Sequence, residues 1–317
     1  MNLSVVITTY DRQDDLVECL RSLSSQFDPP EEVIVVDDGD VDTTQQRLSN
    51  EDLESVELVS GKGTGLPAAR NAGIEAATGD VVAFVDDDVI LPSNWTQELR
   101  RTYERFPEAA GVGGYVLNYS PDGINKANVE SFRYRLLQGI RMAFLHDKVG
   151  EVSPIGILWA PHVFMTSTIR FVDTLQGCNM SFRAEVFEST RFDEWYGSTG
   201  SSACEELDFC TRLSANGHQL IYNPRMVAVH KRSIDGLNDE RSGEPNYGNM
   251  ANLTYFILSH PNMGLLNLLL FVSAVSVYTA ISVDTGYLGA VKDGILAYRR
   301  SESETPVQID GGDSSGQ

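Results

Sequence analysis

Three apolar runs near the start of the chain each end in acidic or polar side chains. The runs span residues 3–10, 32–36 and 81–85 and are rich in Val and Ile, which is typical of buried strands. The segments between them carry apolar residues at helical spacing, as at Leu16 and Leu20. Strands that alternate with helices form parallel sheets through right-handed crossovers. The chain is therefore predicted to be an α/β protein whose strand ends bring polar groups to one edge of a sheet.

The third run leads into three consecutive carboxylates, Asp86, Asp87 and Asp88. Open α/β sheets bind ligands at the carboxyl ends of their strands, which is where these side chains are expected. Carboxylate oxygens are ligands for Mg²⁺ or Mn²⁺, and such an ion would in turn hold a diphosphate. The alternative is a solvated acidic turn in an acidic protein.

Six short motifs follow one another in an order that resembles family 2 glycosyltransferases. They are Val-Ile-Thr-Thr-Tyr-Asp-Arg at 6–12, Val-Val-Asp-Asp-Gly at 35–39, Ala-Arg-Asn-Ala-Gly at 69–73, Phe-Val-Asp-Asp-Asp at 84–88, Asn-Met-Ser-Phe-Arg at 179–183 and Glu-Glu-Leu-Asp-Phe at 205–209. The resemblance covers residues 1–232. It implies an inverting enzyme with the GT-A nucleotide-sugar fold, which is a Rossmann-like, mostly parallel sheet flanked by helices.

The resemblance assigns the nucleotide to residues of the first motifs. Asp38 is expected to read the base, with Thr8 and Tyr10 lining its pocket. A carboxylate suits a uracil edge, so a UDP-sugar is the preferred donor, and GDP-linked donors stay open. Arg70 is expected to contact the nucleotide or its diphosphate, and the alternative for it is a salt bridge with a nearby acid.

The same resemblance places a divalent cation, Mg²⁺ or Mn²⁺, at the acidic triplet. Asp86 is expected near the ribose and Asp88 on the metal, while Asp87 occupies a variable middle position where it adds charge to the donor site. His230 stands where many members have a His after the next strand, and it is a candidate third ligand. The alternative for His230 is an ordinary structural role.

A third group of residues concerns the acceptor. Glu206 falls where the family carries an Asp general base, and this departure leaves Glu205 and Asp208 as rivals. A carboxylate in that role takes the proton of an acceptor hydroxyl. The acceptor wall is expected to include Gly177, Asn179 and Arg183.

The charge of the chain limits its partners. The formal net charge is −21, from 45 acidic and 24 basic residues. A nucleic-acid partner is therefore not expected. So acidic a surface suits a protein that works in concentrated salt, which screens self-repulsion, and it predicts a halophilic, archaeal source. The alternative is an ordinary acidic cytosolic protein.

The chain is predicted to divide into a nucleotide-sugar half at 1–115, an acceptor and base half at 116–235, a membrane-associated segment at 236–300 and a disordered tail at 301–317. Within the third part, residues 264–283 have no charged side chain and are long enough to span a bilayer as a helix. A buried core or dimer helix is the alternative. Another segment, 132–144, has the pattern of a basic amphipathic helix that can lie on a membrane or meet a lipid phosphate.

These expectations combine into one functional prediction. The protein is predicted to be a non-processive inverting glycosyltransferase at the cell membrane, with its catalytic domain facing the cytoplasm. It is predicted to move one sugar to a glycan on dolichyl or polyprenyl phosphate, in protein N-glycosylation or surface-glycan assembly. The alternatives are a dolichyl- or polyprenyl-phosphate sugar synthase and an inactive nucleotide-sugar-binding module.

Overall fold

The computed structural model describes residues 1–51, 56–61, 63, 65–118, 168–201, 203–231, 247–260, 269 and 286–304. The first half alternates strands and helices, as predicted. Its elements are β1 (Leu3–Thr9), α1 (Gln13–Ser24), β2 (Glu32–Asp37), α2 (Val41–Ser49), β3 (Glu57–Ser60), α3 (Leu66–Ala76) and β4 (Val81–Asp86).

In the second half, strands and helices do not alternate regularly along the chain. Its strands are β5 (Val89–Ile90), β6 (Ala109–Asn118), β7 (Arg170–Val172), β8 (Asn179–Arg183) and β9 (Gln219–His230). Its helices are α4 (Trp95–Arg105), the 3₁₀ helices η2 (Ala184–Glu188) and η3 (Glu194–Thr199), α7 (Glu205–Ala215), α8 (Tyr247–Ser259) and α10 (Gly286–Glu304). The predicted amphipathic helix at 132–144 lies outside the described residues.

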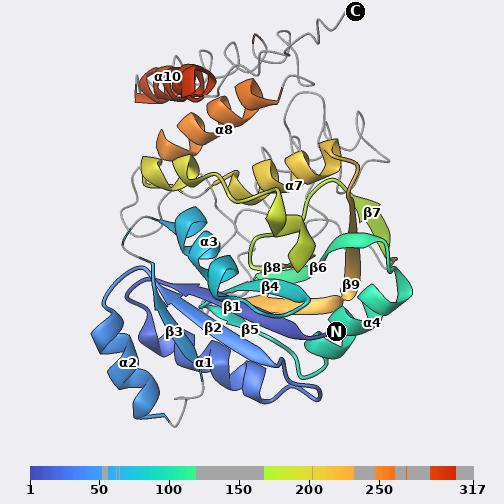
Figure 1. Cartoon of the computed structure of the whole chain (residues 1–317). Coiled ribbons are helices and arrows are strands. Elements are labelled where there is room, and N and C mark those ends of the chain that lie inside the picture. Colours follow the sequence, from blue (N-terminus) through green and yellow to red (C-terminus); the bar gives the residue numbers. More distant parts are fainter. Residues whose placement is uncertain are drawn as a thin grey trace, which may run out of the picture.

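The strands form one mixed sheet in the order β3-β2-β1-β4-β8-β6-β9-β5, with β7 pairing with β9 (Figure 1). Strands β1 to β4 run parallel, and β8 enters antiparallel between β4 and β6. Within the parallel part, Thr8 of β1 lies opposite both Val36 and Asp86. The predicted alignment of three strand ends with acidic or polar groups at one sheet edge is therefore confirmed.

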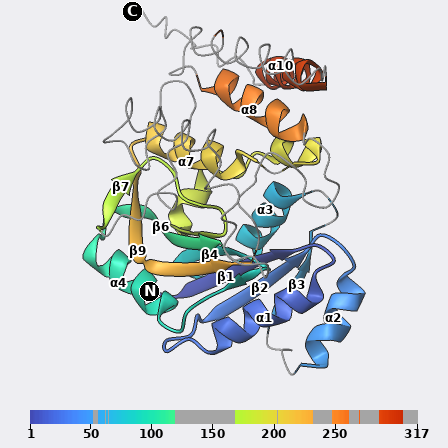
Figure 2. The ribbon, with the colours of Figure 1, turned by 180° about the vertical axis from the view of Figure 1, so that it is seen from behind.

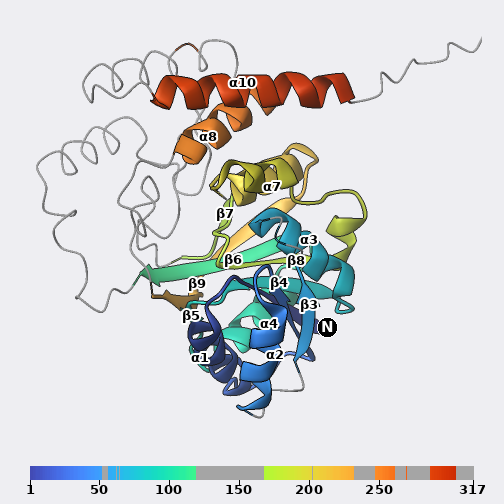
Figure 3. The same ribbon diagram turned by 90° about the vertical axis from the view of Figure 1, so that its left-hand side faces the viewer.

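Helices cover both faces of the sheet. Figures 2 and 3 show α1, α2 and α4 on one side of the strands and α3 and α7 on the other. The alternation of β1 explains the two layers, because Val5 and Ile7 belong to the core under α1 whereas Val6 belongs to the core under α3. The apolar face of α1, which the spacing of Leu16 and Leu20 predicted, is buried against the first of these cores.

Helices α8 and α10 pack on each other beyond α7, away from the sheet (Figure 1). The ring centroid of Tyr255 on α8 lies 4.3 Å from that of Trp195 on η3, so α8 packs against η3. In the described part of the chain, no helix combines the length and the apolar character needed to cross a bilayer. Apart from Leu269, the predicted span 264–283 lies outside the described residues.

The end of α10 corrects one predicted boundary. The helix continues to Glu304, so the first four residues of the segment 301–317 are helical and not disordered. The residues of 301–304, Ser-Glu-Ser-Glu, are polar, and such a composition does not separate a helix end from a disordered tail. Residues 305–317 lie outside the described residues.

Candidate active site

A cavity of about 1060 Å³ lies at the carboxyl ends of β1, β2 and β4. It is lined by Thr8, Thr9, Tyr10, Arg12, Asp38, Gly63, Gly65, Leu66, Ala69, Asp86, Asp88, Gly197, Ser198, Gly200, Ser201 and His230. Most of the predicted donor and metal residues are therefore in one place. The sheet edge supplies the acids, and the end of η3 together with the loop after it supplies another part of the wall.

The two acids after β2 have different positions. Asp37 is buried, and its Oδ1 accepts a hydrogen bond of 2.7 Å from the backbone N–H of Gly39, which holds the turn. Asp38 lines the cavity, and its Oδ2 accepts a 2.7 Å hydrogen bond from the backbone N–H of Gly65. Gly65 has φ +93°, a left-handed conformation that favours glycine. Asp38 thus lines the same cavity as Thr8 and Tyr10, and their contact with the nucleotide stays a prediction.

Asp86, Asp88 and His230 converge on one point of the cavity wall. One ligand atom from each lies within 4.8 Å of the others. His230 reaches this place because β5 pairs antiparallel with β9, which sets Val89 opposite His230. The His230 Nε2 lies 3.0 Å from the Asp88 Oδ1. Two carboxylates and one imidazole fit a divalent cation, and the nitrogen donor suits Mn²⁺ better than Mg²⁺, which prefers oxygen.

Asp87 has a different environment from its two neighbours. Its side chain is fully buried and is not among the residues that line the cavity, so it does not have the donor-binding position predicted for it. Successive residues at a strand end point to opposite sides, which turns Asp87 inward. It accepts a 2.7 Å hydrogen bond from Thr9 and lies 3.1 Å from the Arg12 guanidinium. Burial raises the pKa of Asp87 to about 7, although Arg12 opposes the shift.

Arg70 lies beneath the cavity and not in it. The side chain is 2% exposed, and the guanidinium pairs with Glu205, lies 3.4 Å from Asp86 and donates to the backbone O of Gly177 at 3.2 Å. The structure thus has the salt bridge that was the alternative for Arg70. The predicted contact with the nucleotide or diphosphate does not belong to this geometry, because Glu205 and Asp86 hold the guanidinium.

The three candidate bases at the start of α7 are now distinguishable. Glu205 is buried in its pair with Arg70. Asp208 lies 2.7 Å from the Arg212 guanidinium. Among the described residues, Glu206 makes no ion pair. Burial raises the pKa of Glu206, while the charge of Arg70 lowers it and that of Asp86 raises it. Glu206 is half-buried and is not among the residues that line the cavity.

Two residues expected in the acceptor wall have structural contacts. Asn179 is fully buried, accepts a 2.8 Å hydrogen bond from the Trp95 indole and donates to the backbone O of Met226 at 2.9 Å. Arg183 donates to the backbone O of Ala109 at 3.0 Å. These contacts join β8 to its neighbours in the sheet and to α4, because β8 is a central strand, which the motif could not reveal.

Sequence reasoning missed Arg12 and the loop 197–201. Arg12 lines the cavity, and its guanidinium lies 2.9 Å from the Asp88 carboxylate. Its position at the end of the first motif could have indicated this role. The residues 197–201, Gly-Ser-Thr-Gly-Ser, contain no motif or charged side chain that would indicate a binding site. The loop is held by Asn252 of α8, whose amide donates to the backbone O of Ser201 at 3.1 Å and of Ala203 at 3.0 Å.

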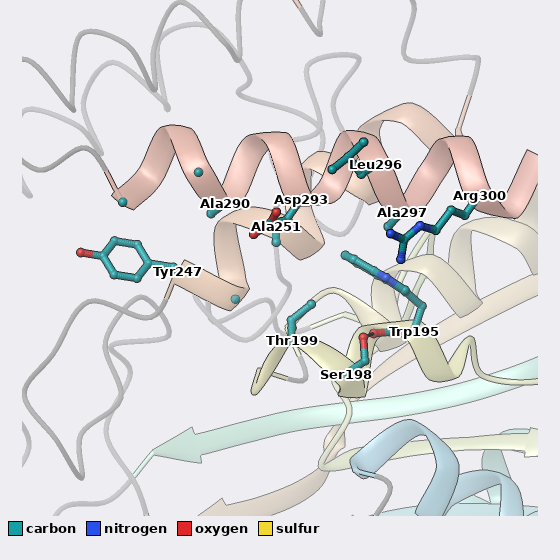
Figure 4. Close-up of a pocket in the computed structure, with 13 residues that line it drawn as sticks. Trp195, Ser198, Thr199, Tyr247, Ala251, Ala290, Asp293, Leu296, Ala297 and Arg300 are labelled. Atoms are coloured by element: carbon teal, nitrogen blue, oxygen red, sulfur yellow. Dashed lines mark hydrogen bonds between the residues drawn. The ribbon is translucent and has the colours of Figure 1, made fainter.

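A second cavity of about 510 Å³ adjoins the first, and Ser198 lines both. It lies between η3, α8 and α10 (Figure 4). Trp195 and Arg300 lie together at one end and Tyr247 at the other, with Leu296 on α10 above (Figure 4). This position makes the C-terminal helices part of the surface around the candidate site.

Comparisons with known proteins agree with the motifs. The model of the family described as "Glycosyl transferase family 2" matches residues 4–157. A glucosyl-dolichyl phosphate glucuronosyltransferase from Haloferax volcanii is 29% identical over 240 residues, which cover 73% of this chain and 69% of that protein.

Solved structures show the same fold at low sequence identity. The S. aureus TarS fragment 1–349 in complex with UDP-GlcNAc superposes with a TM-score of 0.58 at 16% identity, over 96% of this chain and 83% of that one. GalNAc-T7 with UDP, GalNAc and Mn²⁺ superposes with a TM-score of 0.56 at 14% identity, over 81% of this chain and 47% of that one. The expected GT-A-like α/β fold is confirmed.

Proposed function

Because the chain belongs to glycosyl transferase family 2 and is a glycosyltransferase, we propose that it moves one sugar, with inversion, from a UDP-sugar to a glycan carried on dolichyl or polyprenyl phosphate. One observation carries the proposal. A single cavity brings the base-reading candidate Asp38 together with the cluster of Asp86, Asp88 and His230. A nucleotide diphosphate-sugar needs both features at once.

The donor lies in the residue 1–115 half in this proposal. Its base is held at Asp38 and Thr8, and its diphosphate lies near Asp86 and Asp88. These two acids and His230 would hold the divalent cation, which when bound stabilises the charge of the leaving diphosphate. The hydrogen bond from the Gly65 backbone holds the Asp38 carboxylate in place for the donor.

Glu206 is the proposed base. It removes the proton from the acceptor hydroxyl as that oxygen attacks the anomeric carbon from the face opposite the diphosphate. Its neighbour Glu205 is occupied by Arg70, and Asp208 by Arg212. Burial raises the pKa of Glu206, which makes the carboxylate a better proton acceptor than an exposed one.

The acceptor is proposed to approach from the second cavity, which meets the first at Ser198. Trp195 offers an aromatic face for a sugar ring there, and Arg300 a positive charge for a phosphate. The name of the Haloferax volcanii relative supports a glycosylated dolichyl phosphate as the acceptor class. A catalytic domain at the cytoplasmic face of the cell membrane, a halophilic source and a role in surface-glycan assembly belong to the same proposal.

A dolichyl-phosphate sugar synthase is the second candidate. A phosphate acceptor needs little help from a base, so this candidate predicts a turnover that does not depend on Glu206. The observation in its favour is that the acceptor-side cavity contains Arg300, which suits a phosphate.

The test uses membranes that bear the full chain, in high salt with Mn²⁺, and a panel of radiolabelled nucleotide sugars. Dolichyl phosphate and glucosyl-dolichyl phosphate are supplied in separate reactions. We expect label from a UDP-sugar in the organic phase with the glycosylated acceptor, lost in Asp88→Asn and kept in the exposed control Asp42→Asn. Transfer to bare dolichyl phosphate would favour the synthase. Absence of transfer from every donor would contradict both.

A further inference from the structure

Arg12, which lines the cavity, forms an ion pair with the buried side chain of Asp87 beside the proposed metal site. The two guanidinium nitrogens of Arg12 reach different acids, since Nη2 lies 3.1 Å from the Asp87 Oδ1 and Nη1 lies 2.9 Å from the Asp88 Oδ2. Asp87 is in turn held by the Thr9 hydroxyl, which donates to its Oδ2 at 2.7 Å. One arginine thus bridges the middle acid of the triplet and the acid after it.

The turn between β1 and α1 directs Arg12 to this position. Asp11 has φ +53°, in the left-handed region that few non-glycine residues adopt but that Asp tolerates. After this turn, the Arg12 side chain faces Asp87 and Asp88. The backbone conformation at Asp11 and the two ion pairs therefore both favour this orientation of Arg12.

Both oxygens of Asp88 have a defined neighbour. Arg12 contacts Oδ2, and His230 Nε2 lies 3.0 Å from Oδ1. The Asp88 oxygen beside His230 is Oδ1, which is the oxygen that Arg12 does not contact. A carboxylate held in this way can offer only one oxygen to a cation.

We propose that Arg12 and Asp87 are a positioning pair that fixes Asp88 as a single-oxygen ligand for the divalent cation. The inference rests on the proposed function, and it assigns a structural role to Asp87, the middle acid of the triplet. Asp87 does not touch the metal or the donor but anchors the guanidinium that orients Asp88. The pair also balances charge, because Arg12 on one side and Arg70 on the other neutralise part of the acidic triplet.

The test measures Mn²⁺ affinity directly, by the electron paramagnetic resonance signal of free Mn²⁺ during titration of the purified full chain in high salt. We expect Arg12→Met and Asp87→Asn each to weaken Mn²⁺ binding by about tenfold or more, as the loss of residues that orient metal ligands does. The double variant should be no weaker than Arg12→Met, because both changes remove one bridge. Arg47→Met removes a surface arginine and serves as the control.

Arg12→Lys separates geometry from charge. A lysine keeps the positive charge but cannot bridge two carboxylates with a planar fork, so we expect it to recover little affinity. Unchanged or tighter Mn²⁺ binding in Arg12→Met, or full affinity in Arg12→Lys, would overturn the positioning pair. Thermal melts followed by circular dichroism identify variants that lose the fold, and Asp87→Asn then decides in place of Arg12→Met.

The wild-type titration distinguishes failure of the positioning pair from failure of the proposed metal site. If the wild type binds Mn²⁺ and the variants match it, the positioning pair fails and the proposed metal site stands. If the wild type binds no Mn²⁺ with or without UDP, the proposed metal site fails, and the positioning pair fails with it.

Discussion

Arg70 and Glu205 form an ion pair in which both side chains are almost fully buried. The pair joins α3 to the first turn of α7, and so connects the donor side of the cavity to Glu206, the proposed base and the next residue in the chain. It also determines which glutamate is available, because Glu205 cannot leave Arg70 without stranding a buried charge.

The first prediction concerns this pair. Glu205→Gln removes the buried acidic partner of Arg70 and leaves its guanidinium with only Asp86, 3.4 Å away, and breaking a buried pair costs about 3–5 kcal/mol. We expect the free energy of unfolding, measured by denaturant titration, to fall by that amount at any salt concentration. The exposed Glu108→Gln is the matched control and should change little. Equal stability of the two variants would contradict a structural role for Glu205.

The second prediction is a pH dependence. Burial raises the pKa of Glu206, and a base must be deprotonated, so kcat should be high above this raised pKa and fall as pH falls through it. The acid limb should therefore lie above the value of about 4.3 for an exposed Glu. Because the folded state binds this proton more tightly than the unfolded state, stability should fall as pH rises through the same window. A rate profile with its acid limb at or below the exposed value would contradict the assignment.

The third prediction concerns residues 197–201, at the end of η3 and in the loop after it. Asn252 is fully buried, and its amide oxygen also accepts a 2.9 Å hydrogen bond from Thr199. Asn252→Ala leaves these loop groups unsatisfied, at about 1–3 kcal/mol for a buried group. We expect lower stability and faster hydrogen exchange at 197–201, compared with an exposed Asn50→Ala control. Wild-type exchange in this loop would show that α8 does not hold it.

The fourth prediction concerns the second cavity. Leu296 is 38% exposed on α10 and lines that cavity but not the first. Leu296→Trp should fill part of the space and raise the KM for the lipid-linked acceptor by about tenfold, which corresponds to about 1.4 kcal/mol of lost binding. The KM for the nucleotide sugar should not change. A shift in the donor KM with no effect on the acceptor would contradict the assignment of this cavity.

The sequence predicts the parallel part of the sheet well, because β-branched runs that end in acids have few other arrangements. Thr8, Asp38 and Asp86 lie at one edge for that reason. The sequence does not show that Arg70 turns inward, since this depends on Glu205, which is distant in the chain and close only after α3 and α7 have packed. The bridge between Arg12 and Asp87 was hidden for a similar reason, because it needs the left-handed turn at Asp11.

The most direct test of the account is the transfer rate of Glu206→Gln with a glycosylated dolichyl phosphate acceptor, measured beside wild type at saturating donor. A missing general base costs about 10²–10⁴-fold, so we expect kcat to fall within that range while the Kd for the UDP-sugar stays unchanged. Near-normal turnover in Glu206→Gln would contradict Glu206 as the base and would favour a phosphate acceptor.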